Sequence, residues 1–270
     1  ANTLTFRHMA EFYGVPHFAL DVPFESSPQA VDYVAGQLRQ MGQFLAQQTG
    51  IPVDEGELVR AVARSQRTMA LFQRGLEKRR GKQVLSDLTS ELFRTAAFHF
   101  LLGLPEVERY ARQLLREIET APPARGKQLL WIHTTPYWVA PLRQLFAQST
   151  RVQIAACDMS YEGIVEADPT KPYEAMARRL VYSPFNGPAQ RRIDRALAMA
   201  QTVGADGAIW FCHWGCKQTS GAAQLVKRRL EAAGFPTLVL DGDGCDSGNV
   251  NDGQMVTRLQ AFLELLEGCR

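Results

Sequence analysis

The sequence lacks any apolar run that approaches the ~18–20 residues needed by a membrane-spanning helix. It also lacks the positively charged start and following apolar stretch that mark a secretory signal peptide. Neither sign of charge dominates, since 30 Lys and Arg are interspersed with 28 Asp and Glu. No Lys/Arg-rich patch with aromatic residues between the charges stands out. These absences predict no membrane partner and no nucleic-acid partner.

Cysteine is scarce, with five residues in 270. An odd, sparse set in a chain of this length does not resemble the disulfide framework of a small secreted protein. We therefore expect reduced thiols and a cytoplasmic location. Clustered cysteines in that setting indicate metal or redox chemistry.

The first 26 residues contain a helical pattern over 3–14 and a briefly alternating stretch over 15–25, which predicts one short strand. One helix and one strand do not make a domain. We interpret residues 1–26 as the tail of a first α/β domain, and we expect the chain to begin inside a longer protein.

Residues 27–125 form a helical segment in this prediction, with apolar residues recurring at helical spacing in four stretches. Ser27 followed by Pro28 is a typical helix start, and Ser86 is a candidate cap for the third helix. Residues 121–127 have the composition of a linker.

Residues 126–270 alternate between short apolar runs and amphipathic helices. Apolar strands that do not alternate, placed between such helices, predict a parallel sheet covered on both faces. The fold class predicted is α/β, with a Rossmann-like domain over 126–270 that carries the cysteine loops.

Four of the five cysteines fall where predicted strands end. Cys157 and Cys212 are the last residues of their strands, while Cys216 and Cys245 lie in the loops that follow. Ligands of open parallel sheets bind beyond the carboxyl ends of the strands. The four thiols should therefore share one edge of the sheet; Cys269 fits none of this.

Three thiols on one edge suit an iron–sulfur cluster or zinc. Zinc suits the spacing less well, because Cys245 has no nearby cysteine to pair with. For Cys157 and Cys212, simple core packing is the stronger reading. His213 could equally be a hydrogen-bonded structural residue or a functional ligand or acid. Trp210 and Trp214 are predicted to pack in the core.

Residues around the two loop cysteines are candidates for further roles. Lys217 would favour the thiolate of Cys216. The expected helix start at Thr219 and Ser220 can hold a phosphate or carboxylate. Glycines allow close approach of the backbone and offer N–H groups to cluster sulfurs; they are Gly215, Gly242 and Gly244.

These loops resemble a known family. "GCK" at 215–217, "GDGCD" at 242–246 and "QMVTRLQAFLE" at 254–264 are similar to the C-terminal signature of the 2-hydroxyacyl-CoA dehydratase and benzoyl-CoA reductase subunits. Upstream, "DVPFE", "LLWIHTTPYW" and "DMSYE" also fall where that pattern expects them. The resemblance covers essentially the whole chain.

The resemblance implies Rossmann-like α/β domains and a [4Fe-4S] cluster, for which Cys216 and Cys245 match two ligands. Cys212 is an alternative third ligand, and His213 and Lys217 are candidate catalytic residues. It further implies a second subunit of the same family and a separate ATP-dependent iron–sulfur activator. That activator supplies an electron to an acyl-CoA thioester in a lyase or reductase reaction.

The sequence is also compatible with other functions. One relative type carries a double-cubane cluster and reduces small molecules, and a cluster-free structural subunit is the non-enzyme alternative. Two departures from the family pattern stand out. The family carries further cysteines before the equivalent of the start of this chain, and His213-Trp214 replaces a smaller or more polar pair.

Overall fold

The computed structural model describes residues 2–84, 86–147, 149–249 and 252–268. Its centre is a parallel four-stranded sheet, in the order β2-β1-β3-β4. The strands are β1 (Lys127–Ile132), β2 (Val152–Cys157), β3 (Gly207–His213) and β4 (Thr237–Gly242). The predicted α/β, Rossmann-like class is thereby confirmed. The strand order reverses between β1 and β3, and ligands of open α/β sheets bind beyond the carboxyl ends of the strands at such a point.

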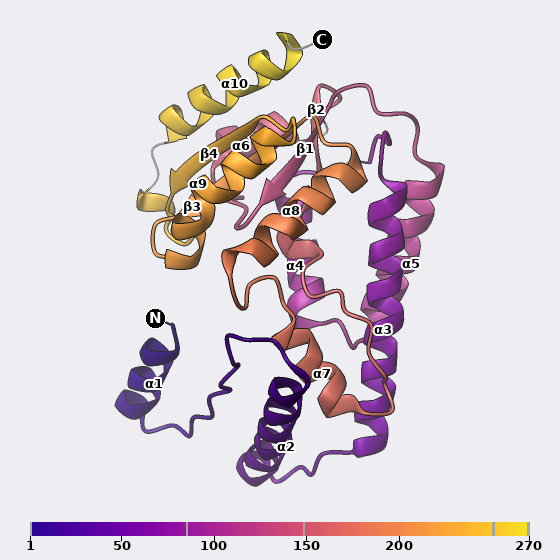
Figure 1. The fold of residues 1–270 in the computed structure, drawn as a ribbon, viewed down its shortest axis with the longest axis vertical. Helices are drawn as coiled ribbons and strands as arrows, with labels where there is room; N and C mark the ends of the chain where they lie inside the picture. The colour runs from indigo at the N-terminus through magenta and orange to yellow at the C-terminus, as the bar shows by residue number, and fades with distance from the viewer. Residues whose placement is uncertain (1, 85, 148, 250–251, 269–270) are drawn as a thin grey trace.

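Helices cover both faces of the sheet (Figure 1). Their bounds are α1 (Asn2–Tyr13), α2 (Pro28–Thr49), α3 (Glu55–Lys78), α4 (Leu88–Phe100), α5 (Pro105–Thr120), α6 (Ala140–Phe146), α7 (Pro172–Val181), α8 (Ala189–Val203), α9 (Lys217–Ala232) and α10 (Asp252–Gly268). Short 3-10 turns follow β2 at Asp158–Ser160 and β4 at Ser247–Asn249.

Alternate residues of each strand enter different cores. Leu130 and Trp210 face a core that includes residues of α3, α5, α8 and α9. Trp131 and Phe211 face the other core, with residues of α6 and α10. Because side chains alternate across a strand, a strand buried on both faces is largely apolar, as β1, β2 and β3 are. Their buried exceptions are Gln128 and Gln153.

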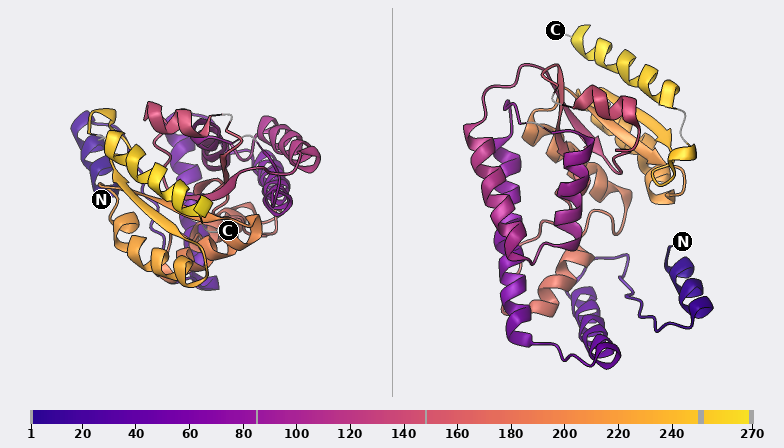
Figure 2. Two further views of the ribbon diagram at one scale, coloured as in Figure 1. Left: turned by 90° about the horizontal axis from the view of Figure 1, so that it is seen from above. Right: turned by 180° about the vertical axis from the view of Figure 1, so that it is seen from behind.

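The helical part extends away from the sheet (Figures 1 and 2). There α2 packs against α7, through Val34, Leu38, Tyr173 and Ala177. The long helices α3 and α5 lie side by side and contribute Phe72, Leu76 and Ile118 to the core beneath the sheet. Segments from both halves of the sequence therefore share cores.

Residues 15–25 do not form the predicted strand. They run without strand pairing to any described residue, and the backbone N–H and C=O of Asp21 bond to the side chain of Gln37 instead. Helix α2 thus satisfies backbone groups that a neighbouring strand would otherwise bond. Among the described residues, no helix is long and apolar enough to cross a membrane.

Other local differences have plain causes. Helix α4 is capped by Asp87 rather than Ser86, because Asp87 and Ser90 form a reciprocal capping box. The sequence pattern does not predict helix α7, since Pro172 resembles an interruption although it occupies the first turn.

Candidate functional site

The carboxyl edge of the sheet collects the polar residues that follow each strand. His133 follows β1, and Asp158 follows β2. His213 ends β3, while Asp243 and Cys245 follow β4. The sheet topology therefore brings together residues more than a hundred positions apart in the sequence.

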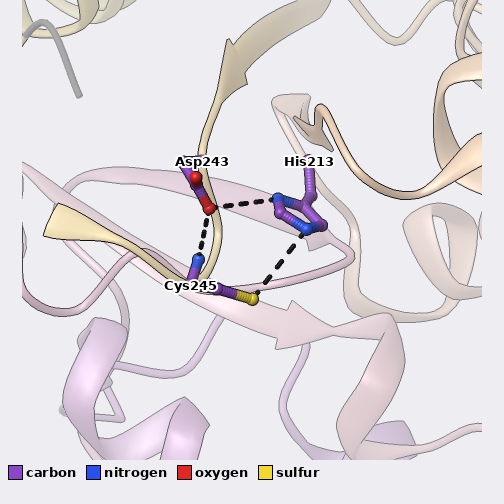
Figure 3. Close-up of side chains that lie close together, drawn as sticks. All are labelled: His213, Asp243 and Cys245. Atoms are coloured by element: carbon purple, nitrogen blue, oxygen red, sulfur yellow. Dashed lines mark hydrogen bonds and ion pairs between the residues drawn. The ribbon is translucent and has the colours of Figure 1, made fainter. Parts of the chain in front are cut away.

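His213, Asp243 and Cys245 form a compact group at this edge (Figure 3). One potential ligand atom from each lies within 4.8 Å of the other two. The backbone N–H of Gly244 donates to His213 Nδ1 at 2.8 Å, and His213 Nε2 lies 3.8 Å from Cys245 Sγ. Asp243 Oδ1 accepts the N–H groups of Cys245 and Asp246, at 2.8 and 3.1 Å. The hydrogen bond from Cys245 is the main reason why the pKa of Asp243 lies below its usual value.

These hydrogen bonds argue against a single metal ion held by the three residues. Nδ1 of His213 uses its lone pair on Gly244, so the ring proton belongs on Nε2. A metal at Nε2 would require that proton to leave or Gly244 to release the ring. As folded, the group presents one thiol and an N–H donor beside it.

Two of the predicted glycines make room for the imidazole. A Cβ at Gly215 would lie 2.9 Å from His213 Nε2, and one at Gly244 would lie 3.3 Å from His213 Cγ and from Thr134 Cγ2. The N–H of Gly244 is occupied by His213 and not held free for a cluster sulfur. Gly242 instead packs against Met255 and Phe211.

Cys216 caps the start of α9. The helix begins at Lys217, two residues earlier than expected, and Lys217 is exposed. The buried hydroxyl of Thr219 donates to Cys216 Sγ at 3.0 Å, and the hydroxyl of Ser220 donates to the Cys216 carbonyl. Both hydroxyls thus donate hydrogen bonds to Cys216. Within the described chain, Cys216 does not join a group of three potential ligands with Cys245.

The cysteines differ sharply in access. Cys245 is exposed and Cys216 half-buried, whereas Cys157 and Cys212 are buried. Burial raises the pKa of the Cys212 thiol, and Asp241 raises it further. The burial of Cys157 and Cys212 agrees with the prediction that both pack in the core. Cys269 lies outside the described residues.

The donor set fits part of an iron–sulfur cluster. Cys216 and Cys245 are the accessible thiols among the described cysteines, and soft thiolates are the ligands that such clusters require. The N–H of His213 beside Cys245 suits a thiolate ligand, which accepts hydrogen bonds. Two thiols are fewer than the usual four ligands, so the remaining ligands must come from elsewhere.

Trp214 stands beside this site and is 60% exposed, so the prediction that it packs in the core is wrong. Its backbone N–H bonds to the carbonyl of Gly242. Trp210, by contrast, is fully buried as predicted.

A buried polar network, not predicted from the sequence, lies next to the same edge of the sheet. Asp158 accepts the backbone N–H of His133 at 2.7 Å and a guanidinium N–H of Arg192 at 3.1 Å. His133 adopts φ 76°, a left-handed conformation uncommon outside glycine. Burial, aided by Arg192, lowers the pKa of His133 to about 4. Both His133 and Asp158 follow strand ends, so the rule that located the cysteines could have found them.

Glu162 and His99 lie next to this network. Glu162 Oε1 lies 3.3 Å from His99 Nε2, which also contacts the Met159 carbonyl at 2.9 Å. Burial raises the pKa of Glu162 to about 8, and Asp158 adds to the effect. Glu162 is therefore largely protonated at neutral pH.

Comparison with known proteins shows which family the chain belongs to. The chain matches the model described as 2-hydroxyglutaryl-CoA dehydratase, D-component, over residues 1–266. The chain belongs to this family. The resemblance found in the sequence motifs is thereby confirmed.

A curated relative in this family is the (R)-2-hydroxyglutaryl-CoA dehydratase subunit alpha of Acidaminococcus fermentans. It is 23% identical over 285 residues, a match that covers 98% of this chain and 58% of the relative. The chain thus spans little more than half the length of this dehydratase subunit.

Proposed function

We propose that this chain is an iron–sulfur-dependent subunit of a 2-hydroxyacyl-CoA dehydratase-type enzyme, with Cys216 and Cys245 as cluster ligands. Its membership of the dehydratase family supports the reaction class. The observation that carries the cofactor assignment is the pair of accessible thiols on the edge of the sheet where ligands bind. The substrate would be an acyl-CoA thioester.

When bound, the cluster would supply one-electron chemistry. The residues of this chain would hold and orient it. Cys245 lies on a turn held by Asp243, and the sulfur of Cys216 accepts a hydrogen bond from the hydroxyl of Thr219. Exposed Lys217 adds positive charge where an anionic thioester would approach. The enzyme would also require a second subunit of the same family and an ATP-dependent activator.

The test is anaerobic purification of the full-length complex followed by iron and sulfide analysis. Loss of a cluster ligand should lower the affinity for the metal at least as much as loss of a residue that supports a ligand. Cys216→Ser and Cys245→Ser should therefore each lower iron occupancy at least about tenfold. Both positions tolerate serine structurally, because Cys216 is a helix cap and Cys245 is exposed.

Cys212→Ala is the matched control, because this thiol is buried against the core and should not bind iron. Full iron in both serine variants would overturn the ligand assignment. A wild-type complex without iron would favour a cluster-free structural subunit. More iron than one cubane per chain, without affinity for CoA thioesters, would favour the double-cubane reductase type.

A further inference from the structure

The imidazole of His213 is held in one orientation by the backbone on either side. Gly215 and Gly244 approach the ring so closely that a Cβ at either position would lie 2.9 or 3.3 Å from a ring atom. His213 is the last residue of β3, and its own backbone is paired with Gly242 of β4. The ring therefore has little freedom to flip.

The hydrogen bonds then assign the ring proton. Gly244 N–H can only donate, so Nδ1 at 2.8 Å must accept. Asp243 Oδ1 lies farther from Nδ1, at 3.6 Å, and already accepts two backbone N–H groups. The proton is left on Nε2, which faces Cys245 Sγ at 3.8 Å.

We infer that His213 donates its Nε2–H to the sulfur of Cys245 and so raises the reduction potential of a cluster bound through that sulfur. This inference rests on the proposed function. Reduction adds negative charge to a cluster, and a hydrogen bond to a ligand sulfur stabilises the more negative state. His213 acts through Cys245 in this view, so it is a positioning residue rather than a catalytic one.

The test compares His213→Phe with His213→Gln in the holoenzyme. Phe keeps an aromatic ring but removes the donor, whereas the side-chain amide of Gln keeps an N–H at a similar reach. A redox titration followed by electron paramagnetic resonance would measure the midpoint potential. We expect His213→Phe to shift the one-electron equilibrium about tenfold towards the oxidised cluster, which is ~59 mV more negative. His213→Gln should stay near the wild-type potential.

A second measurement does not depend on variants that fold. Nitrogen-15 NMR of the wild-type full-length chain without metal should show the Nε2–H tautomer of His213. The Nδ1–H tautomer, or an unchanged potential in a folded, iron-loaded His213→Phe variant, would overturn the inference while leaving the proposed function intact. A wild-type protein that binds no iron would overturn both.

Discussion

At the residue scale, Glu162 links burial to a measurable pH dependence. Its pKa is raised from 4.5 to about 8, chiefly by burial, so between these values the folded state holds a proton that the unfolded state releases. The bound proton of Glu162 therefore contributes to the stability of the folded state. This contribution is complete below pH 4.5 and is lost as the pH rises through 8. The free energy of unfolding should then fall by up to about 1.4 kcal/mol per pH unit in this window.

Glu162→Gln should remove that slope, because the amide keeps an oxygen near His99 but does not titrate. Urea denaturation at several pH values would measure it. His133 acts in the opposite direction below pH 6.5, since its lowered pKa makes acid destabilising. The difference between wild type and variant is therefore the decisive quantity. Parallel profiles for the two proteins would contradict the assignment.

At the scale of elements, the start of the β1–β2 pair depends on Gly126. A Cβ there would lie 2.2 Å from the carbonyl oxygen of Arg151, which accepts the N–H of Lys127. Since both atoms belong to the backbone, the strands would have to separate. We expect Gly126→Ala to lower the free energy of unfolding by about 1–3 kcal/mol, as overpacking does.

Gly36→Ala is the matched control for this change. Gly36 lies inside α2, and apart from the backbone of its own helix no atom lies within 4 Å of the place that a Cβ would take. Alanine should therefore stabilise the protein by about 0.5–1 kcal/mol. Urea midpoints of the two variants should move in opposite directions. Equal effects would mean that the close approach of the Arg151 backbone does not explain the need for glycine at position 126.

At the scale of the whole molecule, stability is unevenly distributed. Of residues 3–13 in α1, Ala10 alone is buried, whereas β1 and β3 are almost wholly buried. Hydrogen exchange should therefore be fast in α1 and slowest in β1 and β3, because local opening costs least where few apolar contacts are lost. Mass spectrometry of peptic fragments would measure this order. Protection of α1 equal to that of the sheet in the isolated chain would contradict it.

The order of residues is enough to predict the sheet and most of the helices around it. Apolar runs such as 207–212 are buried on both faces and are therefore recognisable without knowledge of their neighbours. The same reasoning fails at residues 15–25, whose backbone groups bond to α2, because the pairing of a strand is a long-range property. The rule of strand ends located Cys216 and Cys245 at the correct edge of the sheet.

Which of those residues meet is a property of the folded chain alone. Folding places His213 between two glycines with its Nε2 proton towards Cys245, turns Trp214 outward and buries Cys212. It also joins His133, Asp158 and Arg192, which come from three separate segments of the chain. Hydrophobic periodicity is a local signal that the chain carries in its order of residues. Hydrogen-bond geometry and burial of a polar group depend on packing between distant segments, which that order does not display.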